Sequence, residues 1–367
     1  MLIGIDARKL RDGGIGTYVR HLIEALLAEP RGHRFALFLD PKDFGTTTWS
    51  DRVTREIAVR AGKYSIAEHW VLAAAARAAR VDLFHAPHYT LPLAWNGPAV
   101  VTIHDLIHVR HPQFFPAGAA LYARTIAGMA ARRSRVVIAN SEHTRGDIIE
   151  ALDVPPDRVR VIALGVSSSI ARRDPAQVAA FRGARSLPQD YLLYVGARRG
   201  HKNLGMLLRS LAAIAPGDRP PLVLSGSAWR PSDPLARLAA HLGVTAQIHF
   251  AGDFDDDEAL SCCYSGAALY VQPSLTEGFG LPPLEAMACG VPVLCSTGGA
   301  LPETVGDAAE LLAPSDPSAW AREIVALLAD SSRRSELTRR GIARARGFTW
   351  TDAARRTLEV YEAAIAR

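Results

Sequence analysis

The chain has 367 residues, of which 49% are hydrophobic and 22% are charged, a composition typical of a folded protein without a large disordered part. Its length exceeds the size at which single cores stop growing, so two domains are expected. No apolar run reaches the roughly 18 residues that a membrane span needs, and the opening Met1–Asp6 indicates a strand rather than a signal peptide. We therefore expect a cytoplasmic protein.

The formal net charge of +5 comes from the first half of the chain. Residues 1–168 hold 21 Lys/Arg against 16 Asp/Glu, whereas residues 169–367 hold 21 of each. This imbalance predicts an anionic partner for the first half, such as a lipid diphosphate, a substrate diphosphate or the inner membrane face. It is too small to indicate nucleic acid. The four cysteines are expected to be buried free thiols.

In the first half, short apolar runs alternate with segments rich in Ala, Leu and Arg, which favours a parallel α/β sheet. The predicted strands are Leu2–Ile5, Phe35–Leu39, Leu83–Ala86, Ala99–Ile103, Val136–Ala139 and Val159–Ile162. The predicted helices are Gly16–Ala28, Ile66–Ala79, Gly118–Arg132 and Ser141–Ala151.

The second half repeats this alternation. Its predicted strands are Leu192–Val195, Leu222–Ser225, Ile248–Phe250, Ala268–Val271, Val293–Cys295 and Ala309–Leu312. Its predicted helices are Asn203–Ile214, Asp233–Leu242, Asp256–Cys263, Pro283–Ala288, Pro317–Ala329, Ser332–Ala345 and Thr351–Ala366. We expect two doubly wound, Rossmann-like domains with a ligand cleft between them: residues 1–168, a hinge at 169–190, residues 191–348, and a closing helix at 349–367.

A glycine-rich loop after the strand at 268–271 is the most informative motif. It contains Glu277, Gly278, Phe279, Gly280 and Leu281, and Glu285 lies on the helix that follows. Glycines allow a ligand to approach the backbone, and the amides of a helix start suit a phosphate. Carboxylates suit hydroxyl groups, so this loop indicates a nucleotide sugar. The alternatives are an ordinary strand–turn–helix unit with solvent-facing acids, or a hydrolase-like acid/base pair.

Basic residues follow the first strand of the second half. Arg198 or Arg199, with Lys202 after them, would supply the fixed positive charge that stabilises a leaving diphosphate. Their spacing does not decide between the two arginines, and a solvated basic turn is the structural alternative.

In the first half, His104 and Asp105 end a strand, where the acid would orient the imidazole; a strand end capped by the acid is the bland alternative. Gly14 and Gly16 lie in a loop that allows close approach to a phosphate, or that is simply flexible. No metal site is expected, because the histidines lack metal-ligand spacing and the acidic run at 255–257 opens a helix.

Together, the Gly13–Gly16 loop, His104-Asp105, Arg198/Lys202, the Glu277/Glu285 pair and the closing helix resemble retaining glycosyltransferases of the GT-B fold, particularly glycosyltransferase family 4. The resemblance covers nearly the whole chain, and it implies that residues 1–168 form the acceptor side and residues 191–348 the nucleotide-sugar-binding domain. Gly4–Arg8 and Thr102–Leu106 are also similar to bacterial mannosyltransferases of O-antigen or capsule synthesis, which points to GDP-mannose as the donor.

The resemblance implies a role for each motif. Glu277 and the amides of 278–281 would hold the donor sugar and Glu285 the ribose; Arg198 and Lys202 would hold the diphosphate, approached by the glycine loop, and His104 would touch the sugar. Transfer would proceed with retention, without metal, to a glycan or polyprenyl-linked acceptor. The alternatives are a UDP-glucose or UDP-GlcNAc transferase, a GT-B-like epimerase or phosphorylase, and a non-catalytic assembly partner.

Overall fold

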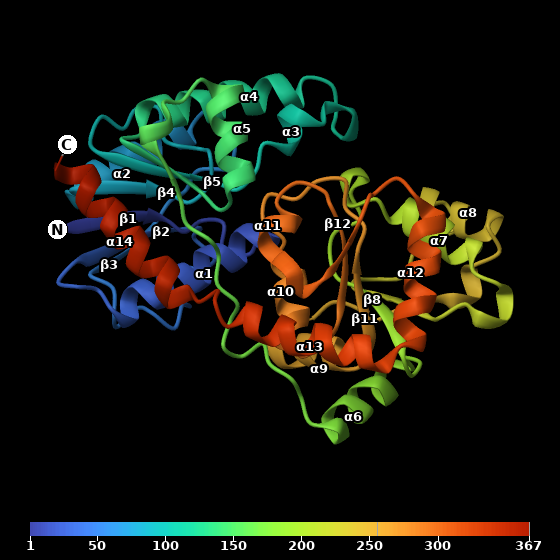
Figure 1. The fold of residues 1–367 in the computed structure, drawn as a ribbon. Coiled ribbons are helices and arrows are strands. Elements are labelled where there is room, and N and C mark those ends of the chain that lie inside the picture. Colours follow the sequence, from blue (N-terminus) through green and yellow to red (C-terminus); the bar gives the residue numbers. More distant parts are fainter. Residues whose placement is uncertain (255, 367) are drawn as a thin grey trace. The chain divides into compact units, whose positions relative to one another are not determined.

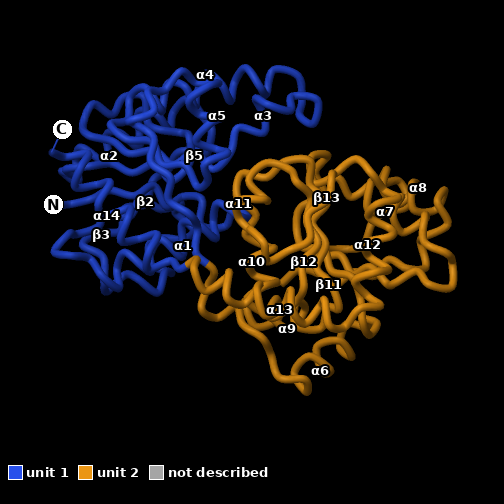
Figure 2. Tube along the Cα trace, viewed as in Figure 1, with its two compact units in different colours: residues 1–165, 349–367 blue, residues 166–348 orange. Residues whose placement is uncertain are grey.

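The computed structural model describes residues 1–254 and 256–366. By its internal contacts the chain divides into two compact units (Figure 2): Met1–Gly165 with Thr349–Arg367, and Val166–Phe348. Each unit contains its own parallel sheet, as the GT-B fold requires. No helix in the part of the chain that the structure describes is long and apolar enough to cross a membrane.

The first unit is a seven-stranded parallel sheet in the order β3-β2-β1-β4-β5-β6-β7. Its strands are β1 (Leu2–Asp6), β2 (Arg34–Leu39), β3 (Arg55–Ala58), β4 (Leu83–Ala86), β5 (Ala99–Ile103), β6 (Val136–Ala139) and β7 (Val159–Val161). Its α-helices are α1 (Gly13–Ala28), α2 (Glu68–Ala79), α3 (Ile107–Arg110), α4 (Ala119–Arg133), α5 (Glu142–Leu152) and α14 (Trp350–Ala366). The central strands β1, β4, β5 and β6 are buried throughout, because helices cover both faces of such a sheet.

The last helix, α14, returns to the first unit and packs along α1 (Figure 1). A buried chain of polar groups ties it to the sheet. The Tyr361 hydroxyl lies 2.7 Å from His85 Nδ1, and His85 Nε2 lies 2.9 Å from the Thr102 hydroxyl. The Thr102 hydroxyl in turn lies 3.1 Å from that of Tyr18 on α1. Burial lowers the pKa of His85 to about 3, so this imidazole is neutral and structural.

The second unit is a six-stranded parallel sheet in the order β10-β9-β8-β11-β12-β13. Its strands are β8 (Tyr191–Tyr194), β9 (Leu222–Leu224), β10 (Ile248–Phe250), β11 (Ala267–Gln272), β12 (Val293–Ser296) and β13 (Glu310–Leu312). Its α-helices are α6 (Pro175–Arg185), α7 (Leu204–Ala213), α8 (Pro234–His241), α9 (Asp257–Ser265), α10 (Leu281–Ala288), α11 (Leu301–Val305), α12 (Pro317–Ala329) and α13 (Ser331–Ala345). The four cysteines are buried and free, as expected.

The segment 169–190, predicted to be a hinge, differs from that expectation because it contains helix α6, which packs on α9 within the second unit. Asp174 caps this helix in a reciprocal pair with Gln177, and Val178 and Phe181 are buried. Strand β3 and the short helices α3 and α11 were also not predicted. β3 is an edge strand without buried residues, so the sequence carries no apolar alternation there.

Candidate active site

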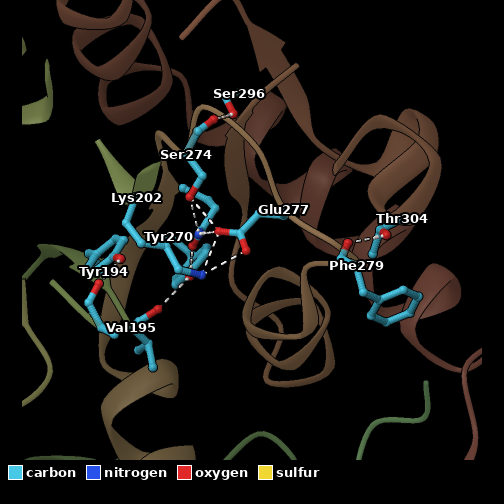
Figure 3. A network of polar contacts seen from close by, with 11 residues as sticks. Tyr194, Val195, Lys202, Tyr270, Ser274, Glu277, Phe279, Ser296 and Thr304 are labelled. Atoms are coloured by element: carbon cyan, nitrogen blue, oxygen red, sulfur yellow. Dashed lines mark hydrogen bonds and ion pairs between the residues drawn. The ribbon is translucent and has the colours of Figure 1, made fainter. Parts of the chain in front are cut away.

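The strand order of the second unit reverses between β8 and β11, which pair directly. At such a switch point the two following loops diverge and leave room for a ligand beyond the carboxyl ends of the strands. The loop after β8 carries Lys202, and the loop after β11 carries Glu277 (Figure 3). The topology therefore brings together two predicted residues that are 75 positions apart in the sequence.

Glu277 is 7% exposed and accepts hydrogen bonds from three side chains. Lys202 Nζ lies 2.8 Å from each carboxylate oxygen. Gln272 Nε2 and Ser274 Oγ donate to Glu277 Oε1 over 2.7 and 2.6 Å. The carboxylate is thus fixed in one orientation by Gln272 at the end of β11, by Ser274 on its own loop and by a cation from the loop after β8.

Burial alone would raise the pKa of Glu277, but the Lys202 ammonium and the hydrogen bonds from Lys202 and Ser274 outweigh it and lower the pKa. Glu277 is therefore ionised at neutral pH. An ionised carboxylate with this many donors suits the binding of hydroxyl groups. It is poorly suited to act as a general acid, which must carry a proton.

The glycines at 298–299 support the Glu277 loop. Gly299 has a φ of +62°, and a Cβ atom there would lie 2.4 Å from the Glu277 carbonyl oxygen. A Cβ atom on Gly298 would lie 2.4 Å from the Ser274 carbonyl oxygen. The Ala300 amide donates to the Glu277 carbonyl over 2.9 Å. Only glycines permit this close packing of the two loops.

Helix α10 begins at Leu281, directly after Gly280, whose φ of +100° makes the turn. Prolines occupy its first turn, and Gly290 follows its end with a φ of +73°. Glu285 is half-buried on this helix and accepts a hydrogen bond of 2.8 Å from the Tyr264 hydroxyl. Gly278 and Phe279 are buried, and Thr304 donates to the Phe279 carbonyl over 2.5 Å.

The two predicted arginines, Arg198 and Arg199, are both exposed. Arg198 donates to the Ser227 carbonyl over 3.3 Å. Within the described part of the chain, Lys202 contacts Glu277, whereas Arg198 and Arg199 do not.

In the first unit, His104 Nε2 donates to the Pro87 carbonyl over 2.9 Å, and the ring meets Tyr18 edge-on at a centroid distance of 4.6 Å. Burial lowers the pKa of His104, although Pro87 and Asp105 act in the opposite direction. The Asp105 carboxylate accepts from the Ile107 amide over 3.1 Å. The imidazole is thus oriented by its hydrogen bond to a backbone carbonyl and not by one to Asp105, whose carboxylate acts on the ring through its charge.

Gly14 and Gly16 lie in the first turn of α1, which begins three residues earlier than predicted, so they belong to a helix rather than a loop. A Cβ atom on Gly16 would lie 2.3 Å from the Leu10 carbonyl oxygen, which explains this glycine by packing. Open space surrounds the corresponding position on Gly14. The acidic run at 255–257 begins outside the described residues; Asp256 caps α9, as predicted for a helix start.

Sequence reasoning missed Gln272 and Ser274, which complete the hydrogen bonding of Glu277. Both residues are buried. The signal available was their polarity at the end of an apolar strand, since side chains at the carboxyl ends of parallel strands face the ligand site.

The family models of known proteins match both units. Residues 12–169 match the model described as Glycosyltransferase Family 4, and residues 179–344 match that described as Glycosyl transferases group 1. With two parallel sheets and the acid–lysine pair at the switch point of the second, the chain belongs to the GT-B glycosyltransferases of family 4.

Its similarity to individual proteins points in the same direction. It is 34% identical to O-antigen chain mannosyltransferase B of Escherichia coli, over 76% of this chain and 74% of that one. It is 35% identical to D-inositol 3-phosphate glycosyltransferase of Salinispora tropica, over 80% of this chain and 66% of that one. Among solved structures, sucrose-phosphate synthase from Thermosynechococcus elongatus superimposes with a TM-score of 0.82 at 25% identity, over 100% of this chain and 99% of that one.

Proposed function

We propose that this glycosyltransferase transfers a hexose to a glycan or lipid-linked oligosaccharide acceptor in surface polysaccharide synthesis. The hexose is mannose, and its donor is GDP-mannose. The transfer is retaining and needs no metal. The similarity to an O-antigen mannosyltransferase supports the choice of sugar and acceptor class. The basic first half of the chain supports a cytoplasmic enzyme that contacts the inner membrane face peripherally.

The ion pair between the half-buried Lys202 and the buried Glu277 carries this proposal. In it, Glu277 and the amides of 278–281 hold the hydroxyl groups of the donor sugar, and Glu285 holds the ribose. Lys202, with Arg198 or Arg199, neutralises the diphosphate as it leaves. The contact of His104 with the donor sugar stays a prediction. The approach of the helix start at Gly14 to the diphosphate also stays a prediction.

The hydrogen bonds of Glu277 support a mechanism without an enzyme nucleophile. The acceptor hydroxyl attacks the anomeric carbon on the face that the diphosphate leaves, so the configuration is retained. The bond from that carbon to the diphosphate oxygen breaks, and the diphosphate takes the proton of the acceptor hydroxyl. The cation at Lys202 stabilises the charge that develops on the leaving group, where no metal is required.

A calorimetric comparison of GDP, UDP and ADP, each with and without EDTA, tests the donor and the metal. We expect tight binding of GDP that EDTA leaves unchanged. A preference for UDP would replace GDP-mannose by a UDP-sugar. Transfer that requires Mg²⁺ would contradict the metal-independent mechanism, and failure of all three nucleotides to bind would contradict the enzyme assignment.

Replacing Glu277 tests the site itself. Glu277→Gln keeps the shape of the side chain but removes the charge that balances Lys202, so we expect kcat/KM to fall by about 100-fold or more. Glu310→Gln is the matched control, because Glu310 makes a surface ion pair with Arg333 in the same unit. Equal turnover by Glu277→Gln and the control would overturn the proposed role.

A further inference from the structure

A second group of charged residues is buried in the first unit, at the switch point of its sheet. The strand order reverses between β1 and β4, which pair directly. Lys9 lies just after β1 and His88 just after β4. This is the position in an open parallel sheet where ligands bind, and neither residue has a role in the donor site proposed above.

Lys9 is 2% exposed, and its Nζ atom has no hydrogen-bond partner among the described residues. The ammonium lies over the ring of Tyr64, 3.7 Å from the ring centroid. A cation over an aromatic face is attracted to it, but the three N–H groups of the ammonium gain no acceptor from this contact. A buried donor group without an acceptor is unfavourable, so this arrangement calls for an explanation.

Glu68, at the start of α2, shows the opposite imbalance. It is also 2% exposed, and its Oε1 atom has no hydrogen-bond partner in the described part of the chain. Its other oxygen, Oε2, accepts from Arg8 over 3.3 Å and from the Tyr64 amide over 3.0 Å. Lys9 and Glu68 are close enough to interact through their charges. One electrostatic cluster therefore contains an unpaired donor and an unpaired acceptor.

The charges around this pair cancel. Arg8 is held by Asp6 through hydrogen bonds of 2.8 Å from Nε and from Nη2, and Lys63 pairs with Asp12 over 2.5 Å. Two carboxylates, Asp6 and Glu68, thus face two cations, Arg8 and Lys9. A phosphate would add an unbalanced negative charge here. A neutral hydroxyl group would instead accept from Lys9 and donate to Glu68.

Two tyrosine rings lie near the pair. Tyr64 is 46% exposed and covers Lys9, with its hydroxyl 3.4 Å from His88 Nε2. Its φ of +60° is unusual for a residue other than glycine. Tyr122 on α4 is 44% exposed; partial burial raises its pKa, and it lies close enough to Glu68 for the carboxylate charge to raise that pKa further. Exposed rings beside a donor–acceptor pair suit the apolar faces and hydroxyl edges of a sugar ring.

We propose that Lys9 and Glu68 form the polar base of a carbohydrate subsite for a neutral sugar of the acceptor, and that the Tyr64 ring covers this base. That the bound sugar belongs to the acceptor rests on the proposed function. That the site binds a carbohydrate rests only on the side chains described above. Binding displaces the Tyr64 ring from Lys9 and places one sugar hydroxyl between the ammonium and the carboxylate.

Saturation-transfer NMR with the methyl glycosides of mannose, glucose, galactose and N-acetylglucosamine tests this subsite. We expect wild type to bind at least one of them, and Lys9→Met to weaken that binding by about tenfold or more, since a site that hydrogen-bonds a hydroxyl loses strongly when one partner is removed. Lys63→Met is the matched control, because this neighbouring lysine already has a partner in Asp12. No binding by wild type, or equal loss in the control, would overturn the proposal.

The melting temperature separates a binding role from a structural one. Burial lowers the pKa of Lys9 to about 8, and the neighbouring charge of Arg8 acts in the same direction. The carboxylates of Asp6, Glu68 and Asp12 oppose this shift without cancelling it. The charge of Lys9 in turn lowers the pKa of His88 and of His104. The charged lysine is therefore a cost to the fold at neutral pH. We expect Lys9→Met to melt no lower than wild type there, whereas a lysine needed for folding would melt lower when replaced.

Two further measurements complete the test. If Lys9→Met does not fold, Glu68→Gln decides, because it retains the side-chain volume and is expected to weaken sugar binding about fivefold or more. Inorganic phosphate should not displace the sugar, and displacement would contradict a neutral ligand. Nucleotide binding without sugar binding rejects the subsite alone, whereas sugar binding without nucleotide binding rejects the proposed function and leaves the carbohydrate site standing.

Discussion

At the scale of single residues, each unit contains a lysine near a glutamate, but only the lysine of the second unit is hydrogen-bonded to its glutamate. Lys202 lies 2.8 Å from both oxygens of Glu277, so each charge compensates the burial of the other. Lys9 and Glu68 are more deeply buried, yet one polar atom of each lacks a hydrogen bond among the described residues. A pair that is complete stabilises its site before the ligand arrives. An incomplete pair is a cost that a ligand can remove.

Lys202→Met should reverse the direction in which acid changes the contribution of Glu277 to the stability of the second unit. The pKa of Glu277 is lowered in the folded state, so its contribution to stability is present above the ordinary carboxyl pKa and is lost as the pH falls through the lowered one. Without Lys202, burial dominates and raises the pKa of Glu277, so the ionised carboxylate destabilises the folded unit at neutral pH and its protonation in the acid range restores part of that stability. Removing one partner of a buried pair also costs about 3 kcal/mol at neutral pH.

Melting curves of wild type, Lys202→Met and Lys202→Arg across the acid range measure this effect. Lys202→Arg retains a cation and is expected to follow wild type more closely. Parallel pH profiles for wild type and Lys202→Met would contradict the coupling of the two charges.

At the scale of elements, the Glu277 loop is shaped by contacts that its own sequence does not contain. The turn at 298–299 after β12 packs against the backbone of residues 274–277, and the Ala300 amide bonds the Glu277 carbonyl. The strands and helices around these loops were predicted within a few residues, since each has a clear apolar period and a capping residue. The support of one loop by another depends on β11 and β12 being neighbours.

Gly299→Ala should disturb this site without removing any functional side chain. The new Cβ atom would lie 2.4 Å from the Glu277 carbonyl oxygen at a φ of +62°, so either the loop moves or the unit is destabilised by roughly 1–3 kcal/mol. We expect weaker nucleotide binding by calorimetry. Gly183→Ala in α6 is the control, because open space surrounds that position and alanine favours a helix. Unchanged nucleotide affinity in Gly299→Ala would show that the loop tolerates the displacement.

At the scale of the whole molecule, the chain crosses between its two units twice, at 165–166 and at 348–349. The second crossing ends in α14, which packs along α1 and is linked to the sheet by Tyr361, His85 and Thr102 (Figure 1). The first unit is therefore completed by the last residues of the chain, and it cannot finish folding before they are made.

Tyr361→Phe should destabilise the first unit selectively. Loss of the hydroxyl leaves His85 Nδ1 buried without its partner, which costs about 1–3 kcal/mol. Urea denaturation should show an earlier transition for the first unit, while nucleotide binding by the second unit persists. Tyr122→Phe, at a largely exposed position, is expected to match wild type. A loss of nucleotide binding in Tyr361→Phe would mean that the two units do not unfold separately.

The sequence by itself determined the fold class, the strands and helices with strong periodicity, and the loop from Glu277 to Glu285, because propensity, apolar spacing and glycine or proline positions are local properties. Only the tertiary structure decided which distant residues meet. It paired Lys202 with Glu277, added Gln272 and Ser274, oriented His104 by the Pro87 carbonyl rather than by Asp105, and buried Lys9 with Glu68. The reason is the order of the strands, which places the ends of β8 and β11, and of β1 and β4, side by side and is not encoded in any local pattern.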